Sequence, residues 1–462
     1  MVLSKAALLS LAALPATQAF FLIPCWPLST QRLDPIVYPG EPASHLHSIV
    51  GGKAFAPVMD YNTTQTSECT TCMVSKDKSN YWVASLFHQN GDSFELVPQH
   101  GSASLYYLNE KTRLGSGEKM EPLPVGLRML AGDPEKRSGS QAFEDQAINY
   151  KCLNYKGTPT DSKGFPDQNC PDGLRAEVTF PSCWDGVNLD SDDHQSHMAY
   201  PTVTFEAGAC PSTHPHHLVT VKMEVIFKTF DFPFSGKNPF VWSTGDPTGF
   251  GLHADLLMGW DYDLLSRAVE QCDNPSGRIQ DCAPFAGLIP ESQVYLDPKT
   301  CEIDSYVNED YSGKLSKLPG CNTIEFGPGR ASKQNCADGA SLKGDWSDYT
   351  GGIAGAVNSI GNHISSAVAG IFPGSGAAPT GAPAQFYEKP AGDAAPAPEA
   401  AKAVPSVHAD ANGNVVTDWV YVTETVTVTG AAPASTGGWN DAAKRDAEEH
   451  IHKHRGHARR SF

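Results

Sequence analysis

Twelve cysteines, all between Cys25 and Cys336, are the feature that most constrains the fold of this chain of 462 residues. An even set confined to one segment is typical of a disulfide-bonded domain made in an oxidising compartment, and it allows up to six disulfides. Their connectivity does not follow from the sequence. Cys69 and Cys72 form a Cys-x-x-Cys pair, which redox and zinc sites also use. Since no second such pair completes a zinc site, we interpret both as structural half-cystines.

The first nineteen residues have the pattern of a secretory signal peptide. Lys5 gives a positive start, an apolar run continues to Pro15, and small residues end the segment at Ala19. A buried N-terminal helix is the alternative. No later stretch reaches the roughly 20 apolar residues of a membrane span. We therefore expect a secreted protein, extracellular or held in a cell wall. The net charge of −18 argues against a nucleic-acid partner.

Composition divides the mature chain in two. Residues 20–338 hold all the cysteines and regular apolar runs, as expected of one globular disulfide-rich domain. Residues 339–462 are rich in Ala, Gly, Pro and Ser, so they bury too little surface to offset the entropy of ordering. We predict a disordered low-complexity tail with a Val/Thr-rich strand at 415–429 and a histidine-rich end. Lys444-Arg445 is a dibasic pair of the kind that secretory proteases cut.

Strand patterns dominate the predicted domain. Residues 217–230 alternate apolar and polar side chains, and residues 174–180 indicate another strand. Residues 94–97 and 104–108 flank a Pro-Gln-His-Gly turn, which predicts a hairpin. The best helical pattern covers residues 261–271. Short strands joined by Gly and Pro turns favour a mostly β fold, a disulfide-stabilised β-sandwich or jelly roll.

Histidines recur at spacings that suit a shared metal ion. His45 and His47 are two residues apart, so a strand would project both from one face, and His253 and Asp255 have the same spacing. His197 follows another histidine at a spacing of three, as on one face of a helical turn. If these segments converge, His45, His47, His197 and His253 would bind a zinc or copper ion, with Asp255 as a further ligand or base. The alternative is that each histidine bonds to the backbone, because no spacing matches a specific motif.

Carboxylates beside tryptophans suggest a different chemistry. Asp246 and Asp255 lie close in sequence to Trp242 and Trp260. A glycoside hydrolase needs two carboxylates around a cleft, and aromatic rings stack on sugars. Asp246 and Asp255 are therefore candidate catalytic residues, whereas tryptophans of an ordinary core are the alternative interpretation. The tripeptide that starts at Asn62 is an N-glycosylation acceptor, consistent with secretion.

Six long stretches between residues 32 and 285 are specific enough to compare with known families. They are Arg32-Leu-Asp-Pro-Ile-Val37, Ser44-His-Leu-His-Ser-Ile-Val-Gly-Gly52, Gly126-Leu-Arg-Met-Leu-Ala-Gly-Asp-Pro134, Phe180-Pro-Ser-Cys-Trp-Asp-Gly-Val-Asn-Leu-Asp190, His194-Gln-Ser-His-Met-Ala-Tyr-Pro201, and Ser243-Thr-Gly-Asp-Pro-Thr-Gly-Phe-Gly-Leu-His-Ala-Asp255 with Gly259-Trp260. Together they resemble the secreted fungal family called domain of unknown function 1996. The resemblance implies secretion, a fungal source and one domain, and it implies no reaction and no catalytic residues.

Two classes of function remain open from the sequence. The first is a non-catalytic extracellular or cell-wall-associated protein, which the low-complexity tail and the lack of a firm catalytic motif favour. The second is a metal- or carboxylate-dependent hydrolase whose partner and substrate is cell-wall polysaccharide. Convergence of the four histidines on one point in an open cleft would favour the second class.

Overall fold

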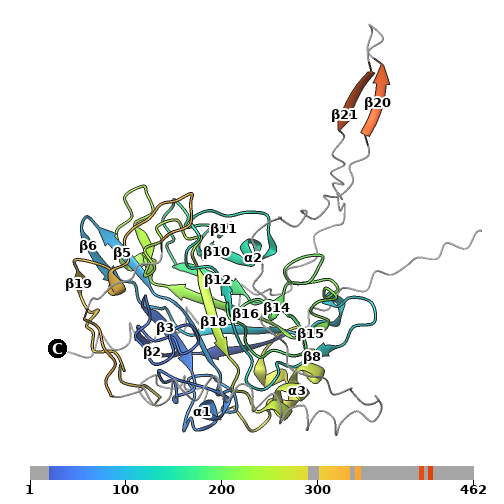
Figure 1. Ribbon diagram of the computed structural model, residues 1–462, viewed down its shortest axis with the longest axis horizontal. Helices are drawn as coiled ribbons and strands as arrows, with labels where there is room; N and C mark the ends of the chain where they lie inside the picture. The colour runs from blue at the N-terminus through green and yellow to red at the C-terminus, as the bar shows by residue number, and fades with distance from the viewer. Residues whose placement is uncertain (1–19, 290–300, 333–338, 345–404, 410–414, 420–462) are drawn as a thin grey trace, which may run out of the picture. The chain divides into compact units, whose positions relative to one another are not determined.

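The computed structural model describes residues 20–289, 301–332, 339–344, 405–409 and 415–419 (Figure 1). The chain divides into two units, Met1–Ile371 and Phe372–Phe462. The second unit contains the antiparallel pair β20 (Pro405–Ala409) and β21 (Val415–Trp419). β21 lies at the start of the Val/Thr-rich strand predicted at 415–429, and the rest of that segment is outside the described residues. The predicted leader and the predicted processing site at Lys444-Arg445 are outside them as well.

Two antiparallel sheets form the layers of a β-sandwich around the main core. The six-stranded sheet has the order β1 (Phe21–Cys25), β7 (Ala103–Leu108), β16 (Thr220–Phe227), β12 (Leu174–Thr179), β10 (Ile148–Cys152) and β11 (Thr160–Ser162). The five-stranded sheet has the order β2 (Pro27–Gln31), β3 (His47–Gly51), β4 (Asn80–Ala84), β18 (His253–Leu257) and β9 (Arg128–Gly132). Alternate residues of both sheets, such as Val221 and Val83, belong to one buried hydrophobic cluster. The predicted mostly β fold is confirmed.

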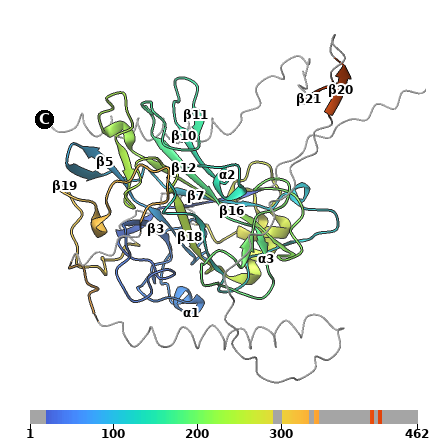
Figure 2. The same cartoon turned by 45° about the horizontal axis from the view of Figure 1, so that its top comes forward.

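Smaller elements complete the first unit (Figure 2). One four-stranded sheet has the order β17 (Phe240–Trp242), β5 (Leu86–Asn90), β6 (Ser93–Leu96) and β19 (Lys314–Leu315), and the other has the order β14 (Met198–Ala199), β13 (Cys183–Trp184), β15 (His216–Leu218) and β8 (Met120–Glu121). The α-helices are α1 (Tyr61–Gln65), α2 (Phe143–Gln146) and α3 (Tyr262–Gln271), and 3₁₀ turns cover Lys111–Arg113, Thr229–Asp231, Ile279–Asp281, Ala283–Phe285 and Pro319–Cys321. None of the helices in the described ranges is long and apolar enough to cross a membrane.

Most local predictions agree with these elements. The strand predicted at 217–230 is present as β15 and β16, the strand at 174–180 as β12, and the helix at 261–271 as α3. The predicted hairpin is wrong, because β6 pairs with β5 and β19 whereas β7 pairs with β1 and β16. The intervening turn instead lies beside the end of β16, where the His100 amide donates to the carbonyl of Ile226. Apolar alternation marks a strand but does not identify its partner.

Five disulfides join cysteines of the described segments. They are Cys25–Cys72, Cys69–Cys301, Cys152–Cys170, Cys183–Cys210 and Cys272–Cys282, and Cys321 is disulfide-bonded as well. The two cysteines of the Cys-x-x-Cys pair bond to different partners, so their interpretation as structural half-cystines is confirmed. The bond between Cys69 and Cys301 spans 232 positions. It therefore ties a late segment to the loop between β3 and β4.

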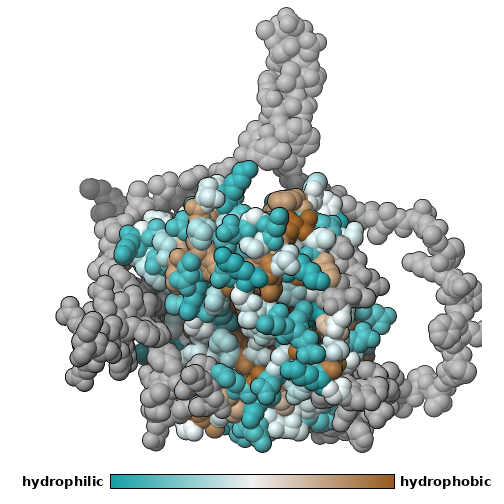
Figure 3. Space-filling model, turned by 90° about the vertical axis from the view of Figure 1, so that its left-hand side faces the viewer, coloured by the Kyte–Doolittle hydropathy of each residue, from teal (hydrophilic) through white to brown (hydrophobic). Residues whose placement is uncertain are grey.

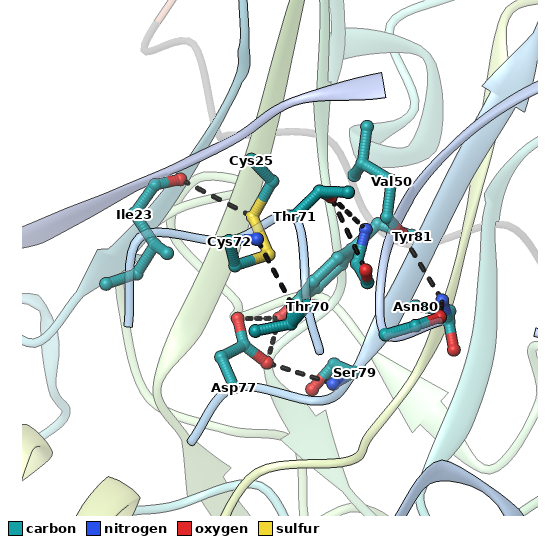
Figure 4. Close-up of a disulfide and its surroundings, with 12 residues drawn as sticks. Ile23, Cys25, Val50, Thr70, Thr71, Cys72, Asp77, Ser79, Asn80 and Tyr81 are labelled. Atoms are coloured by element: carbon teal, nitrogen blue, oxygen red, sulfur yellow. Dashed lines mark hydrogen bonds between the residues drawn. A yellow bond between two sulfur atoms is a disulfide. The ribbon is translucent and has the colours of Figure 1, made fainter. Parts of the chain in front are cut away.

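The Cys25–Cys72 disulfide borders a buried polar network (Figure 4). The Tyr81 hydroxyl donates to Oδ2 of Asp77 at 3.1 Å and lies 2.5 Å from the hydroxyl of Tyr107. Asp77 and both tyrosines are fully buried. Burial raises the pKa of Asp77 to about 7, although hydrogen bonds from its neighbours partly oppose that effect.

Candidate metal centre

One face of the five-stranded sheet carries polar side chains that the sandwich core does not use. Strand pairing places His47 of β3 opposite Ala84 of β4 and Gln31 of β2, and it places His253 of β18 opposite Gly132 of β9. Residues paired across neighbouring strands project from the same face. His47 and His253 therefore point to the same side, away from the main core. The small residue Ala84 stands between them on β4.

Gly132 allows β9 to approach β18 closely beside His253. Its φ is +88°, a backbone conformation that glycine adopts at little cost. A Cβ at this position would overlap the carbonyl oxygen of Leu252 and lie 2.8 Å from the Cα of His253. Any side chain here would push the two strands apart and displace the imidazole.

Three histidine rings meet on this face. His45 precedes β3 by two positions, and its ring centroid lies 4.3 Å from that of His47 and 4.8 Å from that of His253. The Nε2 atoms of His45 and His253 are 2.9 Å apart. Two imidazole nitrogens bound to one zinc ion at about 2.1 Å would stand roughly 3.0 to 3.4 Å apart. The spacing of this pair is therefore close to that of two ligands of one ion.

Further hydrogen bonds orient two of the rings. Nδ1 of His253 lies 3.1 Å from the carbonyl of Gly251, which accepts only, so Nδ1 carries the proton and Nε2 presents a lone pair. Nδ1 of His45 lies 2.9 Å from the hydroxyl of Ser44, which both donates and accepts. Without a metal, Nε2–H of His45 donates to His253. If the ring proton of His45 moved from Nε2 to Nδ1, Nδ1–H would donate to the Ser44 hydroxyl. Nε2 of His45 would then present a lone pair as well.

His47 and Asp255 are fully buried without a hydrogen-bond partner in the described part of the chain. This is true of both ring nitrogens of His47 and of both carboxyl oxygens of Asp255. The carbonyl of Leu33 lies near the His47 ring but makes no hydrogen bond of standard geometry with it. An unpaired buried polar group costs about 1–3 kcal/mol. Four such atoms in one place could hold a ligand, and imidazole with carboxylate is a donor set of transition metals.

Asp34 adds a second carboxylate, which the sequence analysis did not identify as a site residue. It follows β2, and its Oδ1 accepts hydrogen bonds from the amides of Ile36 and Val37. Ligand atoms of Asp34, His47 and Asp255 lie within 4.8 Å of one another. The sequence signal was an Asp-Pro pair after a strand. That pair predicts a turn but does not reveal which side chain the turn directs at a histidine.

Burial determines the charge of these five side chains. It lowers the pKa of His253 and holds the pKa of His45 and His47 well below the ordinary value, and neighbouring imidazoles lower both further. The rings are therefore neutral, which is the form that binds metals. Burial also raises the pKa of Asp34 to about 6 and that of Asp255 well above its usual range, the latter with help from the Asp34 charge. A divalent cation would stabilise both carboxylates in their ionised form.

Distant segments cover the cluster. The side-chain amide of Asn322 donates to the carbonyl of Ser44 at 2.9 Å, and a side chain at Gly320 would overlap the same oxygen. The exposed fractions of His45, His47 and His253 are 4%, 0% and 1%. Two surface cavities, of about 430 and 380 Å³, are lined by other residues. The cluster is thus closed to anything as large as a sugar.

His197 lies outside this cluster. Its Nε2 is 2.9 Å from the carbonyl of Arg128, and its Nδ1 is 2.9 Å from the hydroxyl of Ser191. The expected helical turn is not formed, because residues 194–197 lie in a turn and bend where His194 has a φ of 57°. The structure therefore brings together three of the four histidines that the sequence analysis grouped, and it adds Asp34.

The two candidate catalytic carboxylates lie apart from both cavities. Asp255 belongs to the closed cluster. Oδ2 of Asp246 accepts from the amide of Gly251 at 2.7 Å, and its Oδ1 is 3.7 Å from Nε of Arg137. Trp242 and Trp260 are fully buried and pack in the core, which matches the alternative interpretation of these tryptophans.

The predicted glycosylation acceptor lies on the surface. Asn62 is the second residue of α1 and is exposed, so an enzyme could reach its side chain. Figure 3 shows one face of the molecule, on which hydrophobic residues form separate spots among hydrophilic ones. This pattern is ordinary for a surface exposed to water.

One family model matches the chain, that of the domain of unknown function DUF1996, over residues 34–260. The resemblance found in the sequence is thereby confirmed. The matched segment begins at Asp34 and includes all five residues of the cluster. No curated protein and no solved structure gives a significant match.

Proposed function

We propose that this protein, whose residues 34–260 match the family model of the domain of unknown function DUF1996, is an exported metal-binding protein that holds zinc or copper at His45, His47 and His253. The observation that carries the proposal is the fully buried His47, whose ring nitrogens have no hydrogen-bond partner among the residues described, beside two imidazole nitrogens 2.9 Å apart. Neutral rings with orienting hydrogen bonds are ready to ligate a cation. The two ring nitrogens of His47 have no hydrogen-bond partner within the described ranges.

The closed setting favours a structural or storage role for the metal over hydrolysis. A catalytic zinc site keeps one position open to substrate, whereas structural sites are closed by protein ligands. Here Asn322 and Gly320 lie over the backbone next to His45, and the three histidines do not line either of the two cavities described above. A polysaccharide chain could not approach such an ion. The protein therefore acts by holding metal rather than by cutting polymer.

Export agrees with the covalent chemistry of the domain. Five disulfides form and persist in an oxidising compartment. A metal site outside the cell must hold its ion without intracellular loading factors nearby. Burial of all three histidines would slow the loss of the ion to competing ligands.

Metal analysis of secreted full-length protein tests the proposal. After chelation and reloading with zinc or copper, wild type is expected to keep at least one ion per chain through gel filtration. His45→Ala/His47→Ala is expected to keep none, and His197→Gln, a histidine outside the cluster, is expected to match wild type. Equal metal content in the double variant and wild type, or none in either, would reject the site.

A second candidate function is saccharide binding at the 430 Å³ cavity. Its lining combines the aromatic rings of Phe143, Tyr200 and Phe250 with the carboxylates of Glu144 and Asp193. Aromatic rings stack on the apolar faces of sugars, and its size is that of a ligand pocket. Neither Glu144 nor Asp193 has a basic ion-pair partner among the described residues. The cavity therefore favours a sugar that carries positive charge.

Calorimetric titration separates this second function from the first. Glucosamine oligomers are expected to bind, N-acetylglucosamine oligomers to bind more weakly, and Glu144→Gln to reduce the difference between them. Equal or absent binding of both oligomers would reject saccharide recognition at this cavity and would leave the metal site unaffected.

A further inference from the structure

We propose that His47 bridges two metal ions, one held with His45 and His253 and the other held with Asp34 and Asp255. The inference rests on the proposed function, because it adds a second ion to the same cluster. It makes the site a dinuclear centre whose two halves differ in chemistry. One half offers only imidazole nitrogens to its ion, and the other offers carboxylate oxygens together with the shared ring.

The geometry supplies two separate ligand sets that share only His47. Ring nitrogens of His45, His47 and His253 lie within 4.8 Å of one another, and so do ligand atoms of Asp34, His47 and Asp255. A single ion would need one nitrogen of His47. The structure leaves both of its ring nitrogens buried and without a hydrogen-bond partner among the described residues.

The second set has its own unpaired atoms. Both carboxyl oxygens of Asp255 are fully buried and have no hydrogen-bond partner in the described segments. Strand pairing places Asp255 opposite Trp82 on β4 and Leu130 on β9, and neither side chain balances a negative charge. Asp34 is held in place by the amides of its own turn. Two carboxylates packed together in a dry site call for a cation between them.

The ion held by the three histidines does not by itself serve as the cation between the two carboxylates. The ion of the first set would bind the Nε2 atoms of His45 and His253, which are 2.9 Å apart, together with one nitrogen of His47. Asp255 belongs to a different set and projects from β18 two residues beyond His253, about one repeat of the pleat away. His47 is the residue that both sets share, and an imidazole ring can offer one nitrogen to each of two ions.

The bridge requires one deprotonation step. Neutral His47 carries one ring proton, and binding of an ion at each nitrogen displaces that proton to solvent. The imidazolate then donates one lone pair to each ion. Two divalent cations bring four positive charges, and two carboxylates with one imidazolate return three negative ones. The buried centre thus carries one net positive charge.

Stoichiometry and spectroscopy test the bridge on the full-length protein loaded with copper(II). Wild type is expected to bind two ions per chain by native mass spectrometry, and Asp255→Asn is expected to bind one. Because two copper(II) ions joined by an imidazolate couple magnetically, the integrated electron paramagnetic resonance signal of wild type should fall well below its copper content. The signal of Asp255→Asn should account for all of its single copper.

Asp77→Asn is the matched control, since it removes a buried carboxylate outside the cluster and should retain two coupled ions. One ion per wild-type chain with a full signal would overturn the bridge but leave the proposed function intact, provided that His45→Ala removes that ion. No ion in wild type would reject both. Should Asp255→Asn fail to fold, Asp34→Asn serves the same comparison, with circular dichroism as the check of folding.

Discussion

The Nε2 atoms of His45 and His253 lie 2.9 Å apart although 208 positions separate the two residues in the chain. Their contact depends on the order β3, β4, β18 in the five-stranded sheet, which places the starts of β3 and β18 on either side of Ala84. The fold thus assembles the cluster from segments far apart in sequence. A ligand that binds there would link these segments and stabilise the sheet.

Metal loading is expected to raise the thermal stability of the protein. An ion that binds only the folded state adds about 2.7 kcal/mol at a concentration one hundred times its dissociation constant, which corresponds to roughly 4–8 °C in Tm. His253→Gln should abolish the rise in Tm, because it removes the Nε2 lone pair that His253 presents toward His45. Differential scanning calorimetry with and without zinc measures the effect, and His197→Gln provides the control. A variant His253→Gln that still responds like wild type would contradict the assignment.

Gly132→Ala is expected to destabilise the domain and to weaken its retention of metal. The new Cβ would overlap the Leu252 carbonyl and press on His253, in addition to the cost of a positive φ. Together these effects should lower the free energy of unfolding by roughly 2–4 kcal/mol.

Gly117→Ala is the matched control for that substitution. Gly117 has a φ of +85°, and a Cβ there would meet nothing within 4 Å. Gly117→Ala should lower the free energy of unfolding only by the cost of the positive φ, about 1 kcal/mol, and the variant should keep its metal. Urea unfolding and metal analysis of both variants check this, and equal losses in the two would show that the close approach of β9 to β18 is unimportant.

The sequence predicted the local parts of the cluster because strand periodicity is local. The spacing of two placed His45 and His47 on one side of the chain, and likewise His253 and Asp255, and the structure has both pairs so arranged. Which segments meet depends on strand order, which periodicity does not contain. His197 was grouped with them for its spacing, yet its ring bonds to the backbone of Arg128.

Other features required tertiary information that no pattern carried. Asp34 lies in a turn, so no periodicity directed attention to it, although its carboxyl group lies near that of Asp255. The hairpin predicted around the turn at residues 98–101 failed because its two strands belong to different sheets. The cysteine count predicted a disulfide framework correctly but not that Cys69 would bond to Cys301.

Asn322→Ala is expected to accelerate metal release without changing the ligands. The Asn322 amide donates to the carbonyls of Ser44 and Pro319, so it fastens a late segment over the backbone next to His45. Loss of these bonds should let that segment open more often, and release of zinc to a chromogenic chelator should become several-fold faster. The number of ions bound at equilibrium should stay the same. An unchanged rate would show that release follows another route.

Asp77 is expected to give the metal-free protein a stability that falls as pH rises from about 4 to about 7. Burial raises its pKa from 3.8 to about 7 in the folded state, so between these values the folded chain binds a proton that the unfolded chain has lost. The free energy of unfolding therefore decreases with pH, by up to roughly 1.4 kcal/mol per pH unit from this group. Asp77→Asn removes that contribution, and its stability relative to wild type should rise across the same interval.

Urea unfolding between pH 4 and pH 8, in the presence of chelator, measures this difference. Asp185→Asn is the control: partial burial would raise the pKa of Asp185, but hydrogen bonds from the Val187 and Asn188 amides outweigh it and lower the pKa. Its effect is therefore nearly complete above about pH 5, and from there its difference from wild type should stay constant. A constant difference for Asp77→Asn as well would mean that the carboxylate beside Tyr81 is ionised throughout, and that the network around the Cys25–Cys72 disulfide stabilises its charge.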